Sequence, residues 1–205
     1  VFAYYNDEMS TDTTMTPLDS VKYHKMILQT GMMSVEPQTG YVRSWIGGVN
    51  FQWFQYDHAN KHTRRQVGST FKPFVYATAI DLQSISPCQQ YMDVPVTIKP
   101  GDGRFYLQQP WTPKNSDGKY TNELLTLKDG LRLSKNTISV TLMRELGSPE
   151  PVRDKAALMG IPKEIIPQTP SICLGAVDLS VQEMVFLSQN YFSALEVKCL
   201  KRRIF

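Results

Sequence analysis

The stretch RRQVGSTFKPF, residues 64–74, decides how the rest of this 205-residue chain is interpreted. It continues through Leu82 as a segment that is apolar nearly all round, which is typical of a helix buried inside a domain. Pro73 is tolerated only in the first turn of a helix, where no intrahelical N–H is lost. The sequence therefore predicts a buried helix with Ser69 at or just before its start.

Ser69 and Lys72 are a candidate nucleophile and base. A serine hydroxyl is a weak nucleophile and needs an adjacent base, and residues three apart lie on one face of a helix. A lysine ordinarily titrates near pH ~10.4, but burial among Phe71, Phe74 and Tyr76 would disfavour the ammonium and make a neutral amine accessible. The alternative is a helix-capping serine followed by a lysine whose stem lies along apolar surface.

The same four-residue spacing occurs a second time, at Ser116-Asp117-Gly118-Lys119. Asn115 and the Ser-Asp-Gly that follows are typical of a solvated turn, so we expect no catalytic role there. The recurrence shows that a Ser-x-x-Lys pattern alone is weak, and that its context decides.

A second constellation is Ser134-Lys135-Asn136, which lies between the helical patterns of residues 124–133 and 137–146. A short loop there could turn a hydroxyl and an amide toward a cleft. Ser134 could then relay a proton between Lys72 and the leaving group, and Asn136 could bind a substrate amide. The alternative is an ordinary capped turn, and Ser188-Gln189-Asn190 shows how common the pattern is.

Composition excludes several other classes of function. The formal net charge of +3 and the dispersed Lys and Arg residues do not indicate a nucleic-acid partner. No segment approaches the ~20 consecutive apolar residues that span a bilayer. The three cysteines and three histidines form no metal-binding spacing, so we expect buried free thiols, no metal and no cofactor. These residues are Cys88, Cys173, Cys199, His24, His58 and His62.

Proline, glycine and capping residues predict where the first segments of the chain end. Residues 1–30 are a predicted linker that ends in a short helix capped by Asp19 or Ser20, and the main domain is expected from residue 31 onward. Within the main domain we expect a hairpin over 32–36 and 41–49, an extended loop over 86–122, a helix near 150–159 closed by Gly160, and a helix capped by Ser180.

Taken in order, these segments resemble the transpeptidase domain of class A penicillin-binding proteins, bifunctional peptidoglycan synthases. Ser-x-x-Lys followed by Ser-x-Asn belongs to that family's set of motifs. The resemblance covers residues 17–185, and the matching segments are most similar to sequences from Bacteroidetes. The segments that carry it are Gly40–Gly48, Arg64–Phe74, Trp111–Asn115, Leu133–Val140 and Leu174–Ser180.

The resemblance implies an α+β, penicillin-binding/β-lactamase-like fold with an antiparallel sheet and helical regions, and a serine acyl transfer. Ser69 would attack the D-alanyl-D-alanine amide of a peptidoglycan stem peptide, with Lys72 as base, Ser134 as relay and Asn136 holding substrate. β-Lactam antibiotics would acylate Ser69 in the same way. The implied partners are stem peptides and the cell-wall synthesis machinery, at the periplasmic face of an inner membrane to which the parent protein is anchored.

The chain departs from the family pattern in two respects. Lys-Thr-Gly, the third motif, is absent; Gln29-Thr30-Gly31 and Gln38-Thr39-Gly40 precede Ser69, and we expect them to be turn or strand-end residues. The resemblance also ends after Val185. We therefore expect residues 31–185 to be the N-terminal part of the domain, which is incomplete at the C-terminus, and residues 186–205 to be a divergent tail that is foreign or frame-shifted. Loss of one oxyanion-hole N–H typically costs about 10²–10³ in rate, which predicts weak activity.

Two alternative functions stay open on the sequence alone. One is a serine β-lactamase, although no Glu-x-x-x-Asn pattern follows Asn136 to supply a deacylating residue. The other is a decayed, non-catalytic penicillin-binding module, which the absence of the third motif favours and the two retained motifs oppose.

Overall fold

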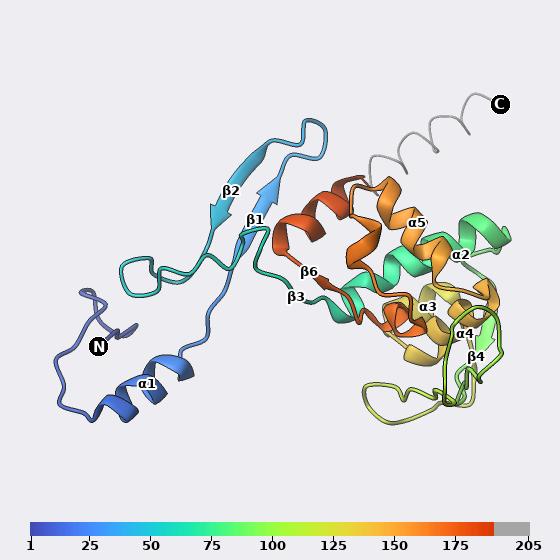
Figure 1. The fold of residues 1–205 in the computed structure, drawn as a ribbon, viewed down its shortest axis with the longest axis horizontal. Coiled ribbons are helices and arrows are strands. Elements are labelled where there is room, and N and C mark those ends of the chain that lie inside the picture. Colours follow the sequence, from blue (N-terminus) through green and yellow to red (C-terminus); the bar gives the residue numbers. More distant parts are fainter. Residues whose placement is uncertain (191–205) are drawn as a thin grey trace. The chain divides into compact units, whose positions relative to one another are not determined.

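The chain is described by a computed structural model in which residues 1–190 are placed (Figure 1). They divide into two compact units: unit 1 comprises Val1–Thr63 and Ser180–Val185, and unit 2 comprises Arg64–Leu179 and residues 186–190. Cys199 and the basic Lys201–Arg203 cluster lie outside the described residues. The predicted boundaries near 30 and 185 stay predictions.

Unit 1 begins with an irregular segment and a short helix, α1 (Pro17–Met26). The helix was expected, but its predicted cap was wrong. The side chain of Thr16 caps it, accepting a hydrogen bond of 3.2 Å from the backbone N–H of Asp19. Thr16 precedes Pro17, which favours the first turn of a helix because it has no N–H to satisfy.

The hairpin predicted in unit 1 is present as β1 (Met32–Val35) and β2 (Val42–Ile46), paired antiparallel with Met33 opposite Trp45. The turn between them contains Gly40 at φ +75°, a conformation that glycine adopts without steric cost. Thr30-Gly31 and Thr39-Gly40 are strand-end and turn residues, as expected.

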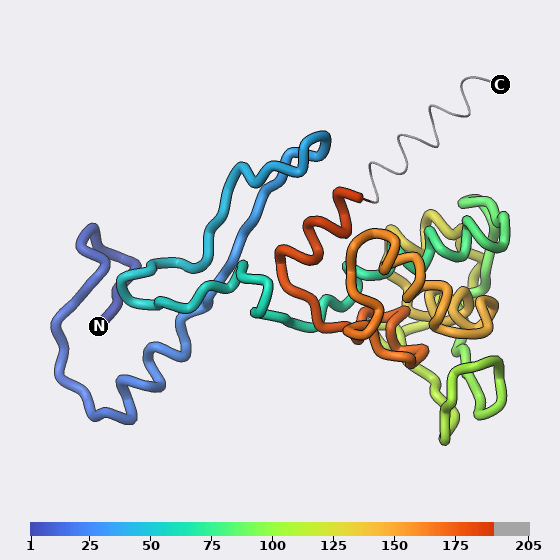
Figure 2. The backbone as a smooth tube through the Cα atoms, turned by 45° about the horizontal axis from the view of Figure 1, so that its top comes forward, coloured from blue at the N-terminus to red at the C-terminus, as the bar shows by residue number. Residues whose placement is uncertain are grey.

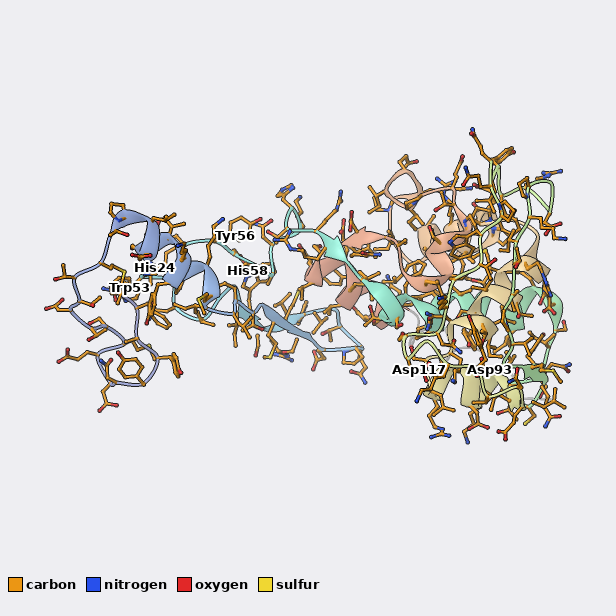
Figure 3. All side chains as sticks on the ribbon, turned by 90° about the horizontal axis from the view of Figure 1, so that it is seen from below. His24, Trp53, Tyr56, His58, Asp93 and Asp117 are labelled. Carbon is orange, nitrogen blue, oxygen red and sulfur yellow. The ribbon has the colours of Figure 1, made fainter. Side chains whose placement is uncertain are left out.

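Aromatic side chains gather around α1 and the loop after β2. His24 stacks on Trp53, with ring centroids 6.5 Å apart, and Phe2 packs edge-on against Phe54. Figure 3 labels His24 and Trp53 in this group, and also Tyr56 with His58, whose rings are 5.0 Å apart. These contacts supply a small apolar centre for the unit.

Unit 2 is built on the helix predicted from residues 69–82. A 3₁₀ turn, η1 (Gly68–Phe71), leads directly into α2 (Lys72–Gln83), and Pro73 occupies the first turn as expected. Phe71, Phe74 and Tyr76 are all buried. The helix is apolar because its neighbours cover it on several sides.

Three further helices pack with α2 in unit 2 (Figure 1). They are α3 (Leu127–Arg132), α4 (Asn136–Leu146) and α5 (Glu150–Leu158), and each coincides with a helix expected from the sequence. Tyr76 and Ala79 of α2 meet Leu127, Ile138 and Leu142 in one apolar cluster. Gly147 ends α4 at φ +72°, a left-handed conformation that glycine adopts without steric cost.

Short antiparallel pairs complete unit 2 and confirm the α+β class. Residues 124–126 were expected to be helical but form β5 (Leu124–Thr126), which pairs with β4 (Gln90–Met92) inside the predicted loop. Helical periodicity cannot reveal this, because pairing with a distant strand decides it. The remaining elements are β3 (Arg65–Gln66), η2 (Lys163–Ile165), η3 (Pro170–Leu174) and β6 (Asp178–Leu179).

Two local expectations concern the cysteines and the C-terminal helix. Cys173 is buried as expected, but Cys88 is exposed, so that prediction was wrong for Cys88.

Residues 181–190 are helical, and Ser180 caps this helix as predicted. The hydroxyl of Ser180 accepts from the N–H of Glu183, while the Glu183 carboxylate accepts from the N–H of Ser180.

The segment before Ser69 is fixed by a backbone crossing, where residues 67–68 run beside residues 175–177 (Figure 2). Val67 N–H donates to the carbonyl of Val177 (2.9 Å), and Gly68 N–H donates to that of Gly175 (3.0 Å). Gly175 has φ +77°, and a Cβ there would lie 1.7 Å from the Gly68 oxygen. Only glycine permits this approach.

Gly175→Ala is expected to destabilise unit 2 by about 2–5 kcal/mol, the sum of a left-handed backbone cost and a forced displacement at the crossing. Gly118→Ala is the matched control, since Gly118 also has a positive φ but no atom within 4 Å of a built Cβ. That control should cost only about 1–2 kcal/mol. Urea unfolding followed by circular dichroism measures both, and equal costs would contradict the crossing constraint.

Candidate active site

The amine of Lys72 is the centre of the site. Its side chain is fully buried at the start of α2, yet Nζ makes three hydrogen bonds. It donates to the backbone carbonyl of Ser134 (2.7 Å) and to Oδ1 of Asn136 (2.7 Å), and it lies 3.1 Å from Oγ of Ser134. The structure thus brings together three of the four residues that the sequence singled out.

These partners suit a neutral amine as well as an ammonium. A carbonyl and an amide oxygen can only accept, so they use two N–H groups, which is the number a neutral amine has. The third partner is a hydroxyl, which can accept from an ammonium or donate to an amine lone pair. Lys72 can therefore change its protonation state without losing a partner.

Burial is the main cause of a lowered pKa at Lys72, which falls from its ordinary value to about 8. Desolvation disfavours the charged amine, and the nearby Cys173 opposes this effect. Burial in turn raises the pKa of the Cys173 thiol well above its ordinary range, so that thiol is protonated at neutral pH. The lowered pKa at Lys72 agrees with what the apolar neighbours predicted.

Ser69 lies one 3₁₀ turn before Lys72, and its carbonyl accepts the Lys72 backbone N–H. Residues i and i+3 eclipse in a 3₁₀ helix, which keeps the two side chains on one side. Ser69 is exposed, and within residues 1–190 its hydroxyl has no hydrogen-bond partner. In this state the hydroxyl is thus accessible from solvent and is not bonded to the amine.

Ser134 reaches Lys72 through an unusual backbone conformation. Its φ of +53° is left-handed, which costs a residue with a Cβ about 1–2 kcal/mol. Its N–H donates to the carbonyl of Leu131, and the next N–H, of Lys135, donates to Gly130. The bend at the end of α3 directs both the carbonyl and the hydroxyl of Ser134 at the amine.

Asn136 is the first residue of α4, and its side-chain amide is held at both ends. Oδ1 accepts from Lys72, and Nδ2 donates to the carbonyl of Lys114 (2.7 Å). One N–H of Nδ2 remains after the bond to Lys114.

The other Ser-x-x-Lys segment, residues 116–119, is an exposed turn with Gly118 at φ +68°, as expected.

Sequence reasoning missed the buried polar residues behind this site: Asp93, Asn115 and Lys135. Lys135 turns inward and pairs with Asp93 at 3.1 Å, although it is the middle residue of the Ser-Lys-Asn segment. Asn115 belongs to the segment Trp111–Asn115 that the resemblance includes. An aspartate flanked by Met92 and Val94 was the one signal in the sequence, because an isolated charge among apolar residues is often buried and paired.

Asp93 is ionised in this arrangement. Burial raises its pKa, but hydrogen bonds outweigh burial and hold the pKa well below the usual range. The donors are Thr137, Asn115, Thr121 and Lys135. Figure 3 labels Asp93 with Asp117, which also faces Lys135 at 3.9 Å.

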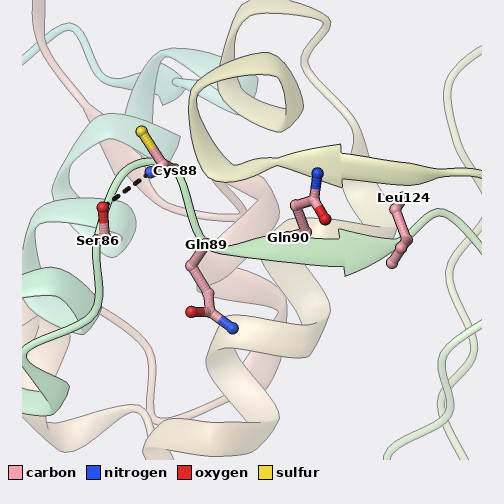
Figure 4. A pocket seen from close by; sticks show the side chains of 5 residues that line it. All are labelled: Ser86, Cys88, Gln89, Gln90 and Leu124. Carbon is pink, nitrogen blue, oxygen red and sulfur yellow. Dashed lines mark hydrogen bonds between the residues drawn. The ribbon is translucent and has the colours of Figure 1, made fainter.

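The described part of the chain also has a depression that is not lined by the candidate catalytic residues. Figure 4 shows an open depression of about 530 Å³, lined by Ser86, Cys88, Gln89, Gln90 and Leu124, which includes none of the residues above. Within residues 1–190 no cluster of three His, Cys, Asp or Glu could hold a metal. None of the helices in this range combines the length and the apolar character needed to cross a membrane.

Comparisons with known proteins agree on one family. The chain is 37% identical to penicillin-binding protein 1A of Neisseria lactamica over 121 residues, which cover 59% of this chain and 14% of that protein. It is 28% identical to penicillin-binding protein 1A of Pseudomonas aeruginosa, over 76% of this chain and 18% of that protein. The chain thus spans less than a fifth of the length of these curated relatives.

Solved structures that resemble this chain belong to the same family. Penicillin-binding protein 1A from Haemophilus influenzae matches with a TM-score of 0.67 and 26% identity, over 76% of this chain and 22% of that one. The transpeptidase domain of Burkholderia pseudomallei penicillin-binding protein 3 shares the fold at 15% identity, with a TM-score of 0.60. A family model described as "Penicillin binding protein transpeptidase domain" matches residues 30–157. The chain belongs to the penicillin-binding protein transpeptidase domain family.

Proposed function

We propose that this chain carries the catalytic residues of a serine D,D-transpeptidase, with Ser69 as nucleophile, Lys72 as base, Ser134 as proton relay and Asn136 as a substrate-binding residue. The observation that carries the proposal is the buried Lys72 amine, with a pKa of about 8 and in hydrogen-bond contact with Ser134 and Asn136. An amine with this pKa is partly neutral at pH 7, as a general base must be.

In the first step of acylation, the Ser69 oxygen attacks the carbonyl carbon of a D-alanyl-D-alanine amide. The Ser69 proton passes to neutral Lys72 as the C–O bond forms. The Ser69 hydroxyl and the Lys72 amine share no hydrogen bond in the free chain, but such catalytic bonds often form only when substrate is bound. We expect substrate binding to bring the exposed Ser69 hydroxyl toward the amine through a change of its side-chain rotamer.

In the second step of acylation, the C–N bond of the amide breaks and the leaving amine takes a proton. Ser134 is suited to deliver it, because its hydroxyl lies 3.1 Å from Nζ and can accept from Lys72 while it donates to the leaving nitrogen. D-Alanine departs, and Ser69 holds the acyl group as an ester. An amine of a second stem peptide then attacks the ester carbonyl, and the C–O bond to Ser69 breaks as the C–N bond of the cross-link forms. The proton that the attacking amine loses passes through Lys72 to the Ser69 oxygen, which restores the hydroxyl.

Membership of this family also supports a proposal for the substrate and for the location. We propose that peptidoglycan stem peptides are the substrate, that the remaining N–H of Asn136 donates to a substrate carbonyl, and that β-lactams acylate Ser69 as substrate mimics. The parent protein would act at the periplasmic face of the inner membrane, anchored to it, together with the cell-wall synthesis machinery.

Penicillin treatment followed by mass spectrometry tests the nucleophile. A single adduct on the chain is expected, Ser69→Ala should abolish it, and peptide mapping should place it on Ser69. Ser116→Ala is the matched control, because Ser116 begins the other Ser-x-x-Lys and lies exposed in a turn. An adduct that survives Ser69→Ala, or one lost with Ser116→Ala, would refute the assignment.

The fate of that adduct separates a transpeptidase from a β-lactamase. A transpeptidase retains the penicilloyl ester for many minutes, whereas a β-lactamase hydrolyses it and turns over. We expect a persistent adduct and slow nitrocefin hydrolysis, since neither Ser134 nor Asn136 is a carboxylate that could activate water. Rapid turnover of nitrocefin would instead identify the chain as a β-lactamase.

The rate of acylation should rise with pH and level off above about pH 8, where Lys72 becomes neutral. Below that pH the neutral fraction falls about tenfold per pH unit, so labelling at pH 6 should be about 100-fold slower than the plateau. Labelling with a fluorescent penicillin in a series of buffers measures the profile. A rate independent of pH between 6 and 8 would exclude Lys72 as the base.

A further inference from the structure

We propose that Asn115 and Asp93 are positioning residues for the Lys72 amine: they hold residues 134–137 so that the Ser134 carbonyl and the Asn136 amide stay against Nζ. The proposal rests on the proposed role of Lys72 as base. Asn115 accepts from the backbone N–H of Asn136, whose side chain contacts Nζ, and Asp93 accepts from Asn115, so each residue acts on the amine indirectly.

Asn115 supplies the cap that α4 lacks. The residue in the N-cap position, Lys135, makes no side-chain capping bond. Oδ1 of Asn115 instead accepts from the backbone N–H of Asn136 (2.8 Å) and of Thr137 (3.3 Å), two donors that have no intrahelical acceptor. A residue from a loop 21 positions earlier in the chain therefore fixes where α4 begins.

Asp93 fixes Asn115 in turn. Oδ1 of Asp93 accepts from Nδ2 of Asn115 (2.9 Å) and from the hydroxyl of Thr137 (2.6 Å). Oδ2 accepts from both the N–H and the hydroxyl of Thr121 and pairs with Lys135. Every one of these partners is a donor, and the carboxylate is fully buried, so its position has little freedom.

The amide of Asn115 is also oriented unambiguously. Its Nδ2 donates to Asp93 and to the carbonyl of Lys119 (2.9 Å), so its Oδ1 must face α4. The neighbouring carbonyl of Lys114 accepts from Nδ2 of Asn136, so the same loop holds both the backbone and the side chain of Asn136. The Oδ1 of Asn136 is thereby directed at Lys72.

Breaking this arrangement should affect the amine more than the fold as a whole. Residues 134–136 cover Lys72 and provide all three of its partners. If the segment moves outward, water reaches Nζ and relieves the desolvation that lowers its pKa; Cys173, the other titratable group that acts on this amine, stays protonated. The amine would then be charged over more of the neutral range and would be a poorer base at pH 7.

The test is Asn115→Ala, with the Lys72 pKa followed by NMR of ¹³C-lysine-labelled chain and the penicillin-labelling rate followed as a function of pH. We expect the Lys72 pKa to rise by about one unit or more toward its ordinary value. Labelling should then slow about tenfold at pH 7 and recover at pH 10, where the amine is neutral in both proteins. A merely structural defect would lower the rate by the same factor at every pH.

Two further variants keep the test decisive. Thr137→Val removes one hydrogen bond to Asp93 while keeping the shape of a fully packed side chain, and should shift the Lys72 pKa in the same direction by less. Val152→Ala makes a cavity in α5, where Val152 is fully buried, and should lower the melting temperature but leave the Lys72 pKa unchanged.

The outcomes separate the two proposals. If Asn115→Ala lowers the melting temperature as Val152→Ala does and leaves the Lys72 pKa at the wild-type value, the positioning role is refuted. If the wild-type chain takes no penicillin on Ser69, the proposed function fails, while the NMR titration alone still decides whether Asn115 and Asp93 control the environment of Lys72.

Discussion

A buried amine governs the organisation of unit 2. Lys72 has no exposed surface, and a buried polar group without partners costs about 1–3 kcal/mol, more when it is charged. The cost is avoided because residues 134–136 place a carbonyl, a hydroxyl and an amide oxygen around Nζ. Two of these three can only accept, and the third can also donate. The same set thus satisfies the ammonium and the neutral amine, which is the property that a base in repeated turnover requires.

The segment that meets this need is itself held under constraint. Ser134 adopts a left-handed conformation that a residue with a Cβ resists, and α4 starts without a cap of its own. Both features persist because other parts of the chain determine them: the end of α3 bonds the N–H groups of Ser134 and Lys135, and the Asn115–Asp93 pair bonds those of Asn136 and Thr137. Strain of this kind is commonly concentrated at functional sites.

The proposed nucleophile is positioned by different means. Ser69 is placed by the backbone, through the 3₁₀ turn that joins it to α2 and through the glycine crossing at Gly68 and Gly175. Its side chain is exposed and free to rotate, whereas the amine is buried and fixed. This division suits a reaction in which the hydroxyl must meet a substrate that arrives from solvent, while the base must stay in a dry environment that lowers its pKa.

The sequence alone was enough to predict the buried helix that follows Ser69, the hairpin of unit 1 and the family. It was also enough to name the candidate pairs Ser69/Lys72 and Ser134/Asn136. These predictions came from local periodicity, from proline and glycine positions and from short motifs, all of which can be seen in the linear chain. These features did not predict that Lys135 turns inward, that Leu124–Thr126 is a strand, that Cys88 is exposed, or that Asp93 and Asn115 support the site. Apart from the exposure of Cys88, each of these depends on a partner 21 or more positions away, and folding decides which distant donors and acceptors meet. The contacts around Lys72 belong to the same class: the residues could be named in advance, but only the folded chain brings α2 against residues 134–136, since their hydrogen bonds span more than sixty positions.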